Sequence, residues 1–169
     1  MKLVFKFIQL LFIGLFIAIF VYPFLHETGH FISSLLLHVR VLDFKIVPVP
    51  SVLCEFDGSI NSIEFLIIGL SGAILPYIVT LLLPMRTFWL WYCKITIKVI
   101  CLISFVVSIT SIFLYQKGNS LSNDDITNIL QHTPQYSLPC FVLFILLFFI
   151  GAVTMIKDFK FFSEKKLYI

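Results

Sequence analysis

Charged residues are scarce in this chain of 169 residues: they make up 12% of it, whereas a soluble domain uses roughly 25% to cover its surface. Hydrophobic residues make up 60%, and 20 residues are Phe. This balance excludes a water-soluble globule. The sequence also lacks CxxC pairs, so we expect free thiols and no disulfide framework at its four cysteines, Cys54, Cys93, Cys101 and Cys140.

The chain also lacks the basic surface of a nucleic-acid-binding protein. Its net charge of +3 comes mostly from lysines near its two ends: Lys2, Lys6, Lys157, Lys160, Lys165 and Lys166. Such clusters typically lie against lipid head groups, so the expected partner is a bilayer and not nucleic acid. No A-x-A cleavage site follows the first apolar run, so we expect this run to be retained.

Four apolar stretches are long enough to cross a bilayer, which takes about 20 residues per helix. We place them at Phe7 to Leu25, Phe65 to Leu83, Phe88 to Tyr115 and Leu138 to Ile156. The apolar pattern of the first resumes at Phe31 to Leu37, and Pro23 offers a kink. In the second stretch, Gly69, Ser71 and Gly72 are small residues that let another helix approach closely. In the third, we expect Lys94 and Lys98 to snorkel toward the membrane surface.

The pattern changes between Val39 and Phe56. Leu42, Phe44 and Ile46 alternate with other residues, then come Pro48-Val49-Pro50-Ser51 and Val52-Leu53-Cys54, which is typical of strand, turn and strand. We therefore predict an all-α polytopic membrane protein: about four transmembrane helices, with a small membrane-associated β-hairpin after the first. Residues 1–169 form one domain, with a core at 7–131, a last span at 138–156 and a basic tail at 157–169.

A polar cluster interrupts the first apolar stretch and reads His26-Glu27-Thr28-Gly29-His30. Two His at i and i+4 stand on one face of a helix about 6 Å apart, so they can bind one metal ion. Glu27 lies beside them, where a general base toward water is needed. In lipid these polar groups are costly unless paired, ligated or hydrated. The alternative interpretation is a buried polar patch that packs helices together.

A catalytic zinc site needs a third protein ligand. The segment Ser120 to Leu130 offers Asp124 and Asp125, although adjacent carboxylates also commonly cap a helix. His38 and His132 are further imidazoles, for which a surface polar role is the stronger expectation.

These features together resemble the site-2 protease family of intramembrane zinc metalloproteases, over roughly residues 10 to 131. The family's third segment reads like L-D-G-G-R-I-L, and the run from Asp124 to Leu130 aligns with it so that Asp125 is the ligand. The resemblance implies Zn²⁺ held by His26, His30 and Asp125, with Glu27 catalytic. Among the departures from the family pattern, Asp124 stands where the family has Leu, Pro76 where it has Asn, and Ile126 where it has Gly.

We therefore expect a zinc metalloendopeptidase that cleaves peptide bonds in or near transmembrane segments of membrane-protein substrates. The strand pair between Val39 and Phe56 offers an edge for an extended substrate. The main alternative is a noncatalytic zinc-binding or regulatory membrane protein that keeps this fold. A metal transporter is disfavoured, because the second and fourth apolar stretches contain no acidic residue or His. Four spans place both termini on one side, and either orientation stays open.

Overall fold

The structure is a computed structural model that describes residues 2–46, 50–55, 61–119 and 125–165. Helices dominate it, and the two strands lie between the second and third α-helices. The elements in chain order are α1 (Lys2–Phe16), a π-helical turn η1 (Ile17–Val21), α2 (Tyr22–Leu36), β1 (Arg40–Lys45), β2 (Ser51–Glu55), α3 (Ser62–Leu82), α4 (Phe88–Gln116), α5 (Asp125–His132), a short 3₁₀ turn η2 (Pro134–Tyr136) and α6 (Ser137–Lys165).

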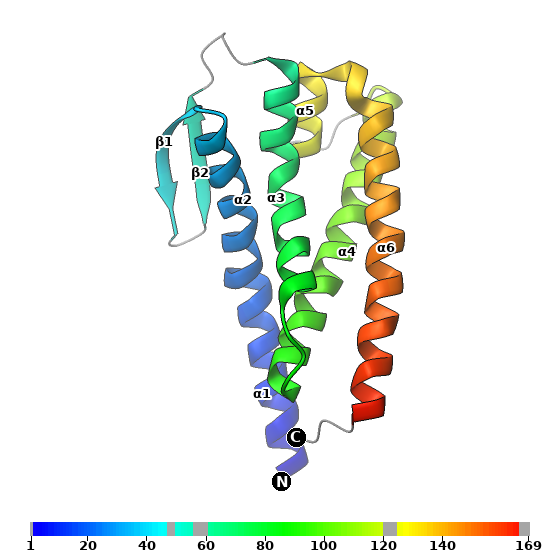
Figure 1. The fold of residues 1–169 in the computed structure, drawn as a ribbon. Helices are drawn as coiled ribbons and strands as arrows, with labels where there is room; N and C mark the ends of the chain where they lie inside the picture. Colours follow the sequence, from blue (N-terminus) through cyan, green and yellow to red (C-terminus); the bar gives the residue numbers. More distant parts are fainter. Residues whose placement is uncertain (1, 47–49, 56–60, 120–124, 166–169) are drawn as a thin grey trace.

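Four of the described helical segments are long and apolar enough to cross a bilayer: Val4–Leu36, Ser62–Leu82, Phe88–Gln116 and Pro134–Glu164. The predicted fold class, with about four such helices and one hairpin after the first, is confirmed. Figure 1 shows α3, α4 and α6 as neighbouring long helices, with α2 on one side. The hairpin, α2 and the short α5 lie in the same half of the molecule (Figure 1).

The first membrane segment is one long helix with a π-helical turn in its middle. The Tyr22 N–H bonds to the carbonyl of Ile17, five residues back, and Pro23 follows immediately. Proline has no N–H to donate, and its ring crowds the carbonyl four residues earlier, here Ile19. The wider π turn accommodates Pro23 and lets the helix continue to Leu36.

The hairpin packs on the outer side of α2. Its strands are antiparallel, with Phe44 opposite Val52 and an irregularity between Val41 and Asp43. The Phe44 ring stacks on Phe31 of α2, with ring centroids 4.9 Å apart. The predicted strands are confirmed, while residues 47–49 of the predicted turn lie outside the described part of the chain.

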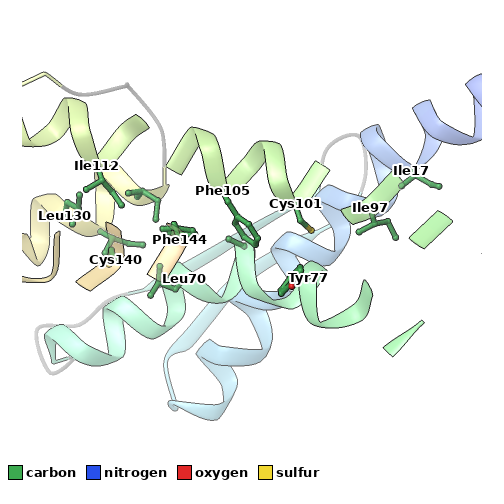
Figure 2. Packing of buried hydrophobic residues seen from close by; sticks show 13 residues of the cluster. Ile17, Leu70, Tyr77, Ile97, Cys101, Phe105, Ile112, Leu130, Cys140 and Phe144 are labelled. Atoms are coloured by element: carbon green, nitrogen blue, oxygen red, sulfur yellow. The ribbon is translucent and has the colours of Figure 1, made fainter. Parts of the chain in front are cut away.

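The core fills the space between α3, α4, α5 and α6. Figure 2 shows Phe105 of α4 and Phe144 of α6 next to each other, and both are fully buried. In a bilayer such contacts stabilise through close van der Waals packing, because lipid tails are as apolar as the side chains. Cys101 and Cys140 are free thiols buried in this core, as expected from their spacing.

Lys94 and Lys98 were expected to reach the membrane surface, and this expectation is wrong. Both are buried, and Lys98 is 0% exposed. Each forms an ion pair with Asp158, which is itself buried, and the Lys94 Nζ to Asp158 Oδ1 distance is 3.4 Å. Asp158 falls within the predicted basic tail after the last span, whereas α6 continues through this segment to Lys165. Asp158 was therefore not expected as a partner inside the bundle. Paired charges are tolerated inside a helical bundle, whereas unpaired ones must snorkel.

Candidate functional site

The His-Glu-His cluster lies on α2, as its helical spacing predicts. The imidazole rings of His26 and His30 meet edge to face, with centroids 4.8 Å apart and an 80° angle between planes. Their Nε2 atoms are 3.1 Å apart. His26 is 21% exposed and His30 13%, so the pair is reachable but largely enclosed.

Asp125 joins this pair from a segment 99 residues away in sequence. It is the first residue of α5, and its Oδ2 lies 2.8 Å from His26 Nε2 and 3.6 Å from His30 Nε2. Burial opposes ionisation of this carboxyl, but its hydrogen bond with His26 and the neighbouring His30 imidazole outweigh the effect of burial and hold the pKa of Asp125 below its ordinary value. The carboxylate is therefore ionised, as a metal ligand must be.

Asp124, the other carboxylate considered as third ligand, lies outside the described residues, as do Ser120 to Asn123. His38 stands apart from the cluster because α2 ends at Leu36, and its backbone φ of 58° belongs to a turn. The exposed His132 packs its ring on Phe65, with centroids 5.0 Å apart. Among the described candidates, the structure thus brings together His26, Glu27, His30 and Asp125.

Helix α3 orients the second imidazole. His30 Nδ1–H donates to the carbonyl oxygen of Ile68 at 2.8 Å. A carbonyl can only accept, so this bond places the proton on Nδ1 and leaves the Nε2 lone pair directed at the site. The sequence did not indicate Ile68, because the partner is a backbone carbonyl, and every residue type carries one.

The small residues of α3 allow this contact, as the sequence predicted. A Cβ on Gly72 would collide with both imidazoles, and a Cβ on Gly29 of α2 would collide with the Ser71 backbone. The Ser33 and Ser71 hydroxyls bond to each other at 2.8 Å beside this contact. Helices α2 and α3 are therefore in close contact at the level of the site, and α3 packs directly against the two imidazoles.

The Glu27 carboxylate lies beside the cluster formed by His26 Nε2, His30 Nε2 and Asp125 Oδ2. Its Oε2 accepts the backbone N–H of Val52 on strand β2 at 2.9 Å. Its carboxylate still lies near the imidazoles, since donor atoms of His26, Glu27 and His30 are all within 4.8 Å of one another. Strand β2 thus holds a carboxylate beside the cluster, where it can act on a water molecule.

Zinc can be tested against this donor set by distance. Donor atoms about 2.0–2.1 Å from one Zn²⁺ at tetrahedral angles lie about 3.3 Å from each other. The separations among His26 Nε2, His30 Nε2 and Asp125 Oδ2 are 2.8, 3.1 and 3.6 Å. Two imidazole nitrogens and an anionic oxygen pointed at one place favour a shared cation, so the residues fit a three-ligand zinc site.

Two cavities meet at the cluster, and both are lined by Glu27, Gly69 and Asp125. The first, about 410 Å³, extends between α2, α3, α4 and the start of α5 and is mainly apolar. The second, about 370 Å³, extends along β2 from Ser51 to Cys54. An extended chain could therefore pass along β2, cross the cluster and continue into the apolar cavity.

No protein-family model, curated protein or solved structure matches this chain. Its function is therefore inferred from the geometry of the site itself.

Proposed function

We propose that this protein is a membrane-embedded zinc endopeptidase that hydrolyses peptide bonds in or near transmembrane segments of other membrane proteins. The observation that carries the proposal is the meeting of Asp125 with His26 and His30 across 99 residues of sequence. A patch that only packs helices needs no ionised carboxylate at this point. The motif spacing and the order of spans, which resemble site-2 proteases, support the same function.

In this proposal His26, His30 and Asp125 hold Zn²⁺, which when bound supplies Lewis acidity toward water and the scissile carbonyl. Glu27 takes a proton from the attacking water as its oxygen adds to the carbonyl carbon. Glu27 then delivers that proton to the leaving nitrogen, the C–N bond breaks, and a carboxylic acid and an amine result. The Val52 N–H keeps the Glu27 carboxylate turned toward the site before substrate arrives.

Strand β2 supports an extended substrate. The Val52 N–H points to Glu27 and not to β1, so this edge of β2 faces the site. A helix hides its carbonyls in intrahelical bonds, and a substrate must be locally unwound to expose one. Pairing with β2 replaces the lost hydrogen bonds, which makes the extended form tolerable beside lipid.

The test is cleavage in reconstituted vesicles. Zinc-loaded wild-type protein is mixed with a panel of synthetic transmembrane peptides whose centres carry helix-destabilising residues, and the products are identified by mass spectrometry. Glu27→Gln is the matched control, since it should keep zinc and lose cleavage. Cleavage that stops with a chelator and returns with zinc supports the proposal. Zinc-loaded protein that cleaves nothing in the panel favours the noncatalytic alternative.

A further inference from the structure

Tyr22 stands at the edge of the zinc-ligand cluster. It is the first residue of α2 and precedes His26 by one helical turn, so the two side chains share a face of the helix. Their ring centroids are 6.2 Å apart. Tyr22 also lines the apolar cavity together with His26, Glu27 and Asp125. A peptide carbonyl placed against the cluster from this cavity therefore shares the cavity with the Tyr22 side chain.

The Tyr22 hydroxyl is buried and has no hydrogen-bond partner among the described residues. Ser104 of α4, which lines the same cavity, is at most a weak hydrogen-bond partner of Tyr22, because the two groups fall outside full hydrogen-bond geometry. A buried hydroxyl without a partner is unfavourable, and such groups in native proteins call for an explanation. A ligand that brings an oxygen into the cavity would supply the missing acceptor.

We infer that Tyr22 is a catalytic residue whose hydroxyl donates a hydrogen bond to the oxygen of the scissile carbonyl; this inference rests on the proposed endopeptidase function. That oxygen gains negative charge as the water oxygen adds to the carbonyl carbon. A hydrogen bond to a charged oxygen is stronger than one to a neutral carbonyl, so Tyr22 stabilises the transition state more than the ground state. Tyr22 transfers no proton, and no bond to it forms or breaks.

Tyr77 offers a matched control within the chain. Its hydroxyl is also buried without a partner in the described structure, but its ring packs on Phe105 in the core, with centroids 5.6 Å apart. It lines neither of the two cavities at the cluster. Tyr22→Phe and Tyr77→Phe therefore remove the same atom from the same kind of environment, once beside the cluster and once away from it.

The experiment uses a transmembrane peptide that the wild-type protein cleaves, labelled with ¹³C at the scissile carbonyl. Tyr22→Phe should keep zinc and lower kcat on the order of 10²-fold, with little change in KM. In the inactive Glu27→Gln background, Tyr22→Phe should also move the ¹³C=O stretch of the bound peptide to higher frequency, because a hydrogen bond to the carbonyl is lost. Tyr77→Phe should change neither kcat nor the stretch.

The two possible failures are distinguishable. If the wild-type protein cleaves the peptide and Tyr22→Phe matches it in kcat and in carbonyl frequency, the role of Tyr22 is wrong while the proposed function stands. If zinc-loaded wild-type protein cleaves no peptide, the proposed function fails and the inference about Tyr22 fails with it. A Tyr22→Phe protein that has lost zinc would show a structural role and would also overturn the inference.

Discussion

Gly72→Ala should remove zinc binding while the protein still folds. A Cβ at this position would lie 2.6 Å from His30 Cε1 and 2.9 Å from His26 Cε1. Ordinary contact begins at 3.4 Å, so the His30 ring must retreat by about 0.8 Å and the His26 ring by about 0.5 Å. Metal sites tolerate deviations of about 0.2 Å in ligand distance, so these movements should break coordination.

The effect of Gly72→Ala on stability should be small by comparison. Overpacking a tight contact lowers the free energy of unfolding by about 1–3 kcal/mol. Replacing a helical Gly by Ala raises it by up to about 1 kcal/mol. We therefore expect a net loss of roughly 0–3 kcal/mol in the free energy of unfolding, which leaves most molecules folded.

The assay for Gly72→Ala is zinc per chain after purification in detergent, measured beside thermal unfolding. Gly151→Ala is the control, since its added Cβ would meet mainly the end of the flexible Leu102 side chain, at 2.7 Å. It should keep wild-type zinc content. If Gly72→Ala also kept one zinc per chain, the close approach of α3 would not position the imidazoles, and the description of the site would be refuted.

The remaining predictions concern the carboxylates. Asp125→Ala should lose zinc while Asp124→Ala keeps most of it, because the side chains of neighbouring residues point in different directions. If zinc analysis showed loss only in Asp124→Ala, the third ligand would be Asp124 and not Asp125. Glu27→Gln should keep zinc and abolish cleavage, and substantial remaining proteolysis would exclude Glu27 as the base. Asp158→Ala leaves Lys94 and Lys98 buried without their partner and should lower the free energy of unfolding by about 3–5 kcal/mol. Glu164→Ala removes the partner of the exposed Lys160 and should change the free energy of unfolding by less than about 0.5 kcal/mol. Equal effects in the two variants would contradict a buried ion-pair network.

The long helices and the hairpin were predictable because local pattern determines them. Apolar length marks each membrane segment, and the alternation around Phe44 marks a strand. The π turn before Pro23 was not predictable in the same way, since a proline in a helical pattern signals a disturbance but not its form. The pairing of Lys98 with Asp158 depends on two distant helices, and no local pattern encodes such a contact.

The candidate site also has a part that local sequence pattern predicts and a part that it does not. The i, i+4 spacing of His26 and His30 indicates a shared face from the sequence alone. Asp125 was selected through the resemblance to a family, and the structure places it beside the imidazoles. The contacts of Glu27 with the Val52 N–H and of His30 with the Ile68 carbonyl were missed, because backbone groups are the partners and every residue carries them.

The zinc content of the purified protein, with wild type and His26→Ala measured side by side, tests the proposed metal site most directly. The donor set of His26, His30 and Asp125 predicts about one zinc per chain in the wild type and almost none in His26→Ala, with both proteins folded. A folded wild-type protein that contains no zinc and cannot be loaded with it would contradict the account.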